Sequence, residues 1–313
     1  MEQGMDIRKA AVIGFGATGA PIAHLMGAML GNGFRLVATG ARREDMEHES
    51  VTVNGELFSP KFIPAYDGWG APDLLVVCVK NYSLRSALPD VRAAVGPDTV
   101  LLPLQNGVYA CDFFRKAFPH NMVLRGYVQG PNTRRRGNAI RYTNPGTIHF
   151  GTSRPDKLAA VQAVAGLFAE AGMPSVVEDE IERSVWRKWM LNVAGNTITA
   201  LTSADYSDFR WDPELVRLCR ASMTEFLEVA HAQHVGLDQS DVEEVVDYFT
   251  SYEGSKRTSM LEDVLARRKT ENEFLAGELV RRADALGIAV PVTRTLYGLM
   301  HVKEELYRNG SHA

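Results

Sequence analysis

Short apolar runs alternate with helical segments through the first half of the chain. Four segments are almost continuously apolar, as expected for strands buried on both faces of a parallel sheet: residues 9–14, 35–39, 73–79 and 99–104. The segments 17–30 and 84–95 have helical character, and Pro21 fits only in a first helical turn. Strands that alternate with helices predict a doubly wound parallel sheet.

The pattern changes beyond residue 121. Four more strands are expected around a helix at 158–171: residues 122–128, 139–143, 147–150 and 175–177. Within the first part, Asn54-Gly55 is a hairpin signal. Beyond Glu178 almost every segment is predicted to be helical: residues 181–201, 213–235, 241–251, 261–286 and 293–307. We therefore expect an α/β domain over residues 1–179 and an all-α domain over residues 180–313.

One predicted helix, residues 182–201, carries a polar stripe on an otherwise apolar surface. Four polar residues recur at every fourth position and therefore share one face of the helix: Ser184, Lys188, Asn192 and Asn196. Apolar residues on the other sides indicate a helix that is packed over most of its surface. An unpaired buried polar group costs about 1–3 kcal/mol, so the stripe needs hydrogen-bonding partners or a chemical task. A plain solvated or hydrogen-bonded stripe is the alternative.

Composition narrows the class of protein. The 313-residue chain is 45% hydrophobic and 23% charged, which is typical of a globular protein large enough for two domains. A net charge of −4 gives no reason to expect nucleic acid or an anionic membrane as a partner. Three distant cysteines fit a reducing cytosol better than a disulfide framework. The glycine-studded run 10–34 is a poor signal peptide or membrane span, so we expect a cytoplasmic protein.

A glycine motif lies directly after the first predicted strand and opens the first predicted helix: Gly14-Phe15-Gly16-Ala17-Thr18-Gly19. In this context the motif is typical of a dinucleotide-binding turn. Its first glycine permits the tight turn, its second lets the backbone approach a pyrophosphate, and its third allows the helix to pack closely on the strand. The helix N-terminus attracts the phosphates. A glycine-rich turn without a ligand is the alternative.

The end of the second strand indicates which dinucleotide binds. An acidic residue there would bind the ribose hydroxyls of NAD, but the sequence has Arg42 and Arg43, with Glu44 and Asp45 only later. Guanidinium groups suit a 2′-phosphate through charge-assisted contacts. NADP(H) is therefore the expected cofactor, and a solvated pair of loop arginines is the alternative.

Two further loops begin with residues that suit a ligand. Lys80 and Asn106 follow the third and fourth apolar runs, at the carboxyl ends of strands where ligands gather in such sheets. Each could also be a cap or a surface group. No set of residues has the spacing of a metal site, so we expect no metal.

Taken together, these residues resemble the ketopantoate reductase (2-dehydropantoate 2-reductase) family over nearly the whole chain. Beyond the glycine motif, the resemblance rests on four groups that occur in order: Val79-Lys80; Gln105-Asn106-Gly107; Trp186-Arg187-Lys188 with Asn192 and Asn196; and Thr258-Ser259 with Asp263, Thr270 and Glu271. The last two groups are more specific than the glycine motif.

The resemblance implies a Rossmann-type domain joined to a helical domain, and NADPH-dependent reduction of a small 2-oxo acid, 2-dehydropantoate to (R)-pantoate. It implies that Lys188 is the general acid that protonates the ketone oxygen, and that Glu271 is the carboxylate that supports this lysine. Four residues would bind or line the substrate: Asn106, Asn192, Asn196 and Ser259. Lys80 and Asn106 would also lie near the nicotinamide.

The chemistry of these residues agrees with the resemblance, because a partly desolvated lysine becomes an acid that works near neutral pH. Without the resemblance, a surface position for Glu271 and a helix N-cap role for Ser259 would be the plainer interpretations.

One residue departs from the family pattern. Ketopantoate reductases usually carry an asparagine three residues before the substrate serine, where it contacts the terminal hydroxyl of the substrate. This chain has Lys256 in that place. Lys256 could serve a different or more acidic 2-oxo acid, or point to solvent.

Two other functions therefore stay open beside ketopantoate reduction. One is a paralogous 2-hydroxyacid dehydrogenase that acts on another branched or aromatic 2-oxo acid. The other is a non-catalytic NADP(H)-binding regulator, which would need only the nucleotide loop. The apolar helical half is compatible with a homodimer.

Overall fold

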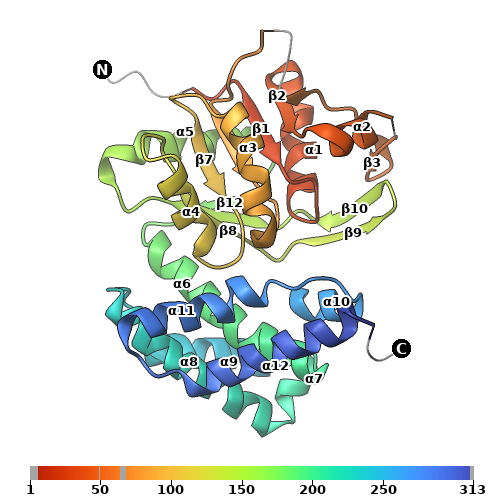
Figure 1. Ribbon diagram of the computed structural model, residues 1–313. Coiled ribbons are helices and arrows are strands. Elements are labelled where there is room, and N and C mark those ends of the chain that lie inside the picture. The colour runs from red at the N-terminus through yellow and green to blue at the C-terminus, as the bar shows by residue number, and fades with distance from the viewer. Residues whose placement is uncertain (1–5, 49, 64–67, 311–313) are drawn as a thin grey trace. The chain divides into compact units, whose positions relative to one another are not determined.

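The computed structural model describes residues 6–48, 50–63 and 68–310, without the side chains of residues 41 and 42. The chain divides into two compact units (Figure 1). Residues 1–105 and 110–182 form the first unit, and residues 106–109 and 183–313 form the second. The short segment 106–109 thus belongs with the helices, although its chain neighbours on both sides belong with the sheet. A domain boundary after residue 179 stays a prediction.

A five-stranded parallel sheet is the centre of the first unit. Its strands lie in the order β5 (Phe62–Ile63), β2 (Phe34–Val37), β1 (Ala10–Ile13), β6 (Leu74–Val77) and β7 (Val100–Pro103). Every residue of these strands is buried, as the continuous apolar runs predict. Four helices alternate with them: α1 (Gly19–Leu30), α2 (Gly40–His48), α3 (Leu84–Ala94) and α4 (Tyr109–Ala117). The predicted doubly wound sheet is confirmed.

The order of the strands decides where a ligand binds. The chain moves outward from β1 to β2 and then crosses back to β6 on the other side of β1. The loops after β1 and β6 therefore leave adjacent strands at the point where the order reverses, which is the usual ligand site of such sheets.

Two smaller sheets complete the first unit. One has the order β4 (Glu56–Leu57), β3 (Thr52–Val53), β10 (Ala139–Asn144) and β9 (Asn132–Arg136). The other has the order β12 (Ser175–Val177), β11 (Thr147–Gly151) and β8 (Arg125–Gln129), and α5 (Leu158–Glu170) packs on it. The Asn54-Gly55 hairpin is confirmed, since both residues have positive φ, as a tight hairpin turn requires.

The second unit is helical, as predicted. Its elements are α6 (Ile181–Leu191), the π-helical turn η4 (Asn192–Asn196), α7 (Thr197–Thr202), η5 (Tyr206–Arg210), α8 (Pro213–Ala232), α9 (Gln239–Ser251), α10 (Ser259–Leu265), η6 (Asn272–Phe274), α11 (Ala276–Leu286) and α12 (Pro291–Arg308). Trp189 and Phe226 are fully buried, with ring centroids 4.9 Å apart. Their apolar contact holds α6 against α8.

Two predicted helices of this unit are wrong in detail. The helix expected at 182–201 is interrupted by the π-helical turn at Asn192–Asn196. The helix expected at 261–286 is broken into α10, η6 and α11. At that break Arg267 has a φ of 51°, outside the helical region. The backbone N–H and hydroxyl of Thr270 then donate to the Glu304 carboxylate of α12 instead of to a preceding turn.

Candidate active site

The glycine loop between β1 and α1 has the geometry that a dinucleotide requires. Gly14 has a φ of 97°, and a Cβ on it would lie 2.5 Å from the Val79 nitrogen. A Cβ on Gly19 would lie 1.8 Å from the Gly14 carbonyl oxygen. By contrast, a Cβ on Gly16 would meet no atom within 4 Å. Gly14 and Gly19 are therefore required by the protein's own packing, whereas Gly16 leaves an open surface on the backbone.

The first turn of α1 fits a phosphate group. It contains no acidic residue, and Thr18 at its N-cap makes no side-chain capping bond. The Ala20 N–H donates to the Gly16 carbonyl oxygen and Pro21 has no N–H, so the positive end of the helix dipole is what α1 offers an anion. Phe15, Ala17 and Thr18 belong to the same loop, with Phe15 buried and Ala17 exposed. These residues fit a dinucleotide pyrophosphate, which would lie over Gly16.

Gln105 links the ends of two neighbouring strands. Its side-chain amide donates to the carbonyl oxygens of Val77 (3.1 Å) and Val79 (2.9 Å), so it joins the end of β7 to the loop after β6. Lys80 follows in that loop, half-buried at the start of η2 (Asn81–Ser83). Gln105 thereby fixes the backbone that carries Lys80.

Of the two arginines after β2 that could bind a 2′-phosphate, the structure describes the side chain of Arg43 alone. Arg42 lies in α2, and its side chain is outside the described part of the chain. The Arg43 guanidinium donates to Glu47 (2.8 Å) and lies over the Phe62 ring at 5.5 Å. Arg43 is therefore already held by α2 and β5.

Lys188 lies on α6, half-buried in the second unit. Burial, and after it the positive charge of Lys256, lower the pKa of Lys188 from its ordinary 10.5 to about 8, against the opposing charge of Glu271. An ammonium group with this pKa is largely protonated at neutral pH and still gives up its proton readily.

The next turn of the helix presents a buried amide. The Nδ2 of Asn196 donates to the Oδ1 of Asn192 at 3.4 Å, and both residues are at most 5% exposed. The Nδ2 of Asn192 is buried and has no hydrogen-bond partner among the described residues. Because an unsatisfied buried donor costs about 1–3 kcal/mol, Asn192 indicates a place for a ligand acceptor. The π-helical turn that holds both residues is a type of distortion frequent at functional sites.

Glu271 is buried beside Asn106. The Asn106 amide donates to the Glu271 carboxylate at 3.4 Å, and Glu271 is 6% exposed at the start of η6. The Trp189 indole donates to the Leu275 carbonyl oxygen (3.3 Å), which fixes α6 on the turn that follows Glu271. The surface position that Glu271 would be given without the family resemblance is wrong, since tertiary contacts bury this side chain.

Ser259 is exposed at the first position of α10, and the N-cap is the preceding Thr258. The Thr258 hydroxyl accepts from the Leu261 N–H and lies 2.8 Å from the Thr199 hydroxyl. Thr199 also donates to the Gly195 carbonyl oxygen. The N-cap interpretation of Ser259 was thus wrong by one residue, and the Thr199–Thr258 contact joins the Ser259 segment to the π-helical turn.

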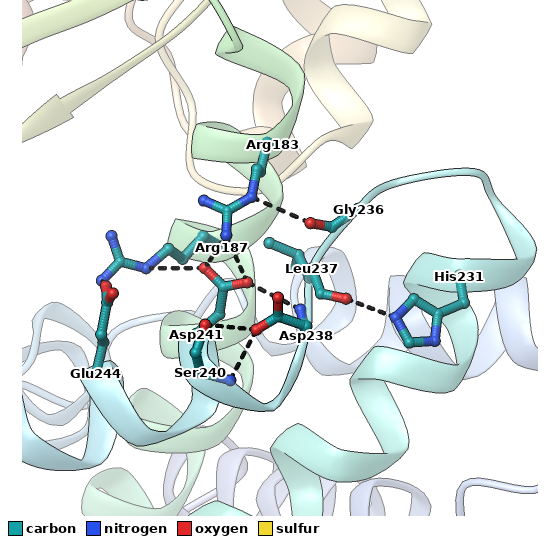
Figure 2. Close-up of polar contacts among 9 residues, drawn as sticks. All are labelled: Arg183, Arg187, His231, Gly236, Leu237, Asp238, Ser240, Asp241 and Glu244. Carbon is teal, nitrogen blue, oxygen red and sulfur yellow. Dashed lines mark hydrogen bonds and ion pairs between the residues drawn. The ribbon is translucent and has the colours of Figure 1, made fainter.

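An ion-pair cluster around the buried Asp241 fixes α6 against α9 (Figure 2). The Nη2 of Arg183 lies 2.8 Å from each carboxylate oxygen of Asp241, and its Nε donates to the Gly236 carbonyl oxygen at 3.1 Å. The Nε of Arg187 lies 3.5 Å from the same carboxylate, and its Nη2 pairs with Glu244. Asp241 also accepts from the Asp238 N–H in the capping box of α9. Arg183 and Arg187 precede Lys188 on α6, so this cluster sets the position of the helix that carries Lys188.

The second unit therefore brings together most of the residues predicted for substrate chemistry. The charges of Lys256 and Glu271 both act on Lys188, and Asn106 contacts Glu271. Sequence reasoning assigned no role to Gln105, Thr199, Thr258 or Asp241. Gln105 and Thr258 had a signal in the sequence, because each belongs to a group that carries the family resemblance. The glycine loop, Lys80 and Arg42 belong to the first unit.

Two absences apply to the part of the chain that the structure describes. No helix there is both long and apolar enough to cross a membrane. No group of three or more histidine, cysteine, aspartate or glutamate side chains there is arranged to hold a metal ion.

The fold and the glycine loop define a Rossmann-type α/β protein with a second, helical unit. The sequence profile of "Ketopantoate reductase PanE/ApbA" matches residues 10–155, and that of its C-terminal part matches residues 180–304. The chain belongs to the ketopantoate reductase family, whose members are oxidoreductases that use a nicotinamide cofactor.

Individual relatives agree with this assignment. A 2-dehydropantoate 2-reductase of Halobacterium salinarum is 33% identical over 233 residues, which are 74% of this chain and 76% of that protein. The crystal structure of a PanE/ApbA family ketopantoate reductase from Ralstonia eutropha JMP134 is 25% identical, with a TM-score of 0.79 over 96% of this chain and 99% of that one. A D-mandelate dehydrogenase with NADH and anilino(oxo)acetate is 23% identical, with a TM-score of 0.83 over 96% and 99% of the two chains, and shares the fold.

Proposed function

We propose that this protein reduces a 2-oxo acid to the 2-hydroxy acid with NADPH, and that 2-dehydropantoate, which yields (R)-pantoate, is its substrate. The observation that carries the proposal is the half-buried Lys188, whose pKa is lowered to about 8, within reach of the Glu271 charge.

Each residue has a task in this reaction. When bound, NADPH would supply a hydride for the carbonyl carbon, and the protein's own residues supply the proton and the orientation. Lys188 donates a proton to the ketone oxygen, which becomes more basic as negative charge develops on it. The Nδ2 of Asn192, which lacks a protein partner among the described residues, donates to the same oxygen. Glu271 stabilises the protonated lysine and is itself oriented by Asn106.

The remaining predicted residues bind the ligands. Asn196 orients the Asn192 amide through its 3.4 Å contact, and the exposed Ser259 hydroxyl binds substrate. Gly14 to Gly19 hold the pyrophosphate, Arg42 binds the 2′-phosphate, and Lys80 lies near the nicotinamide. The chain thus has residues for nucleotide binding, for substrate binding and for proton transfer. A nucleotide-binding regulator would need only the residues for nucleotide binding.

An aromatic 2-oxo acid is the second candidate substrate. Lys256, in place of the usual asparagine, lies over the rings of Tyr206 (5.7 Å) and Tyr252 (5.5 Å). Aromatic walls of this kind suit a planar substituent. The similarity of fold to a D-mandelate dehydrogenase is compatible with this choice but does not favour it.

The substrate is tested by following NADPH oxidation with ketopantoate, 2-oxoisovalerate and phenylglyoxylate. We expect the highest kcat/KM with ketopantoate. A kcat/KM at least tenfold higher with phenylglyoxylate would replace ketopantoate by an aromatic substrate. No oxidation with any 2-oxo acid, together with tight NADPH binding, would favour the regulator.

The cofactor is tested by a matched pair of variants. We expect Arg42→Ala to raise the KM for NADPH about tenfold and to leave the KM for NADH unchanged, because only NADPH carries the 2′-phosphate. Arg43→Ala is the control, since its guanidinium already contacts Glu47 and Phe62. Equal effects of Arg42→Ala on both cofactors would contradict a role in reading the 2′-phosphate.

A further inference from the structure

Lys256 is held in a fixed place by the backbone around it. The Tyr206 N–H donates to the Lys256 carbonyl oxygen at 3.0 Å, and the Ser255 hydroxyl donates to Asp205. Two residues later, Thr258 contacts Thr199 of α7. The segment that carries Lys256 is thus attached to η5 on one side and to α7 on the other.

The side chain of Lys256 is constrained as well. Its Nζ lies 5.7 Å and 5.5 Å from the ring centroids of Tyr206 and Tyr252. These two rings pack against each other with centroids 5.2 Å apart. A lysine that lies over two aromatic faces is partly removed from water, which strengthens any ion pair that it forms.

The charges around Lys256 are unbalanced. Within the described residues, its ammonium group makes no ion pair with a carboxylate, whereas its neighbour Arg257 pairs with Glu262 at 3.7 Å. Three charged groups act together here: Lys188, Lys256 and Glu271. With both lysines protonated their sum is one positive charge, which a single carboxylate neutralises.

We propose that Lys256 binds the carboxylate of the 2-oxo acid and that the site selects monoanionic substrates. This inference rests on the proposed function, because it assumes that Lys188 faces the ketone oxygen. The carboxylate and the ketone of a 2-oxo acid are on adjacent carbons. Two cationic groups close enough to influence each other can therefore hold both, one at each end.

Binding of the carboxylate also prepares the acid. The charge of Lys256 is one cause of the lowered pKa of Lys188, and Glu271 opposes it. A bound carboxylate neutralises Lys256 and so raises the pKa of Lys188 in the complex. Lys188 therefore stays protonated up to a higher pH in the substrate complex than in the free protein.

The test compares Lys256→Met with the control Arg257→Met, which removes the same charge one residue away from an exposed pair. The probes are oxamate, an unreactive isostere of a 2-oxo acid, and its neutral methyl ester, and binding is measured by calorimetry on the protein saturated with NADPH. We expect Lys256→Met to weaken oxamate binding about 30-fold or more and ester binding less than threefold. Arg257→Met should change neither by more than threefold. Equal losses for acid and ester, or equal effects of the two variants, would overturn the proposal.

Kinetics separate a binding role from a structural one. Where turnover is measurable, Lys256→Met should raise the KM for 2-oxo monocarboxylates and move the alkaline limb of kcat/KM to higher pH. An increase in KM confined to 2-oxo dicarboxylates would overturn the choice of a monoanion. Absence of turnover in the unaltered protein would sink the proposed function alone, since the oxamate measurement does not depend on reduction.

Discussion

The glycine loop of the first unit and the polar cluster of the second unit are built from different parts of the chain. The loop uses backbone: a Cβ on Gly14 or Gly19 would lie less than 3 Å from neighbouring backbone atoms, whereas a Cβ on Gly16 would meet no atom within 4 Å. The cluster uses side chains from separate segments, held by tertiary contacts such as the Asn106–Glu271 bond. A site built from backbone is determined by the local sequence, and the one carbon that an alanine adds can abolish binding there. A side-chain site depends on distant supports and can lose function while the fold persists.

The largest expected effect is that of Lys188→Met. We expect kcat/KM to fall about 10³-fold, within the range for loss of a general acid, while NADPH binding stays within threefold. Steady-state kinetics and cofactor titration measure the two quantities. Lys157→Met, on the surface of the first unit, is the control. A Lys188→Met protein that keeps more than a tenth of its kcat/KM would rule out this lysine as the acid.

Asp241→Asn tests whether the side-chain cluster depends on distant support. The substitution leaves Arg183 and Arg187 facing a neutral group that is 1% exposed. Both arginines keep more than a third of their side-chain surface exposed and stay partly solvated without the carboxylate, so we expect chemical denaturation to show a loss of about 1–3 kcal/mol. Glu244→Gln, which affects only the more exposed pair with Arg187, should cost less than about 1 kcal/mol. Similar losses for both variants would show that the burial of Asp241 adds nothing to the contribution of its ion pairs to stability.

Two glycine substitutions sharpen the contrast within the backbone site. Gly19→Ala places a Cβ 1.8 Å from the Gly14 oxygen, so we expect it to destabilise the fold by about 1–3 kcal/mol. Gly16→Ala meets no protein atom within 4 Å. It should leave the melting temperature within a degree or two and raise the KM for NADPH about tenfold, because the methyl group occupies the space of the pyrophosphate. Unchanged KM in Gly16→Ala would remove the cofactor from this loop.

The smallest effect concerns stability and pH. The folded-state pKa of Lys188, about 8, lies below its ordinary 10.5, so between these values the unfolded chain binds more protons than the folded one. The unfavourable contribution of Lys188 is therefore complete below pH 8 and fades as the pH rises toward 10.5. Lys188→Met should be more stable than the unaltered protein at pH 7, by roughly 1–2 kcal/mol after allowance for partial exposure. Denaturation at pH 7 and pH 10 measures whether this advantage shrinks; a constant difference would mean that the lysine is not desolvated.

The same contrast explains what the sequence could predict. The parallel sheet and the glycine turn between β1 and α1 depend on local patterns, namely buried apolar runs and glycines at fixed spacing, and the structure has both elements where they were predicted. The break between α10 and α11 depends on a bond from Thr270 to Glu304, 34 residues away, which no local pattern reveals. The capping role went to Thr258 rather than Ser259 because its hydroxyl also meets Thr199. The cluster around Lys188 was expected through the family resemblance, since the periodic stripe alone left a plain packed helix open.

The π-helical turn at Asn192–Asn196 has a consequence for insertions and deletions in this chain. A π-turn accommodates one residue more than an α-helical turn, so it works as a built-in insertion between α6 and α7. Removing one residue there would restore regular winding and rotate everything downstream by about 100° around the helix axis. Asn196 and Thr199 would then turn away from Asn192 and Thr258. Length at this position is therefore as strongly constrained as residue identity.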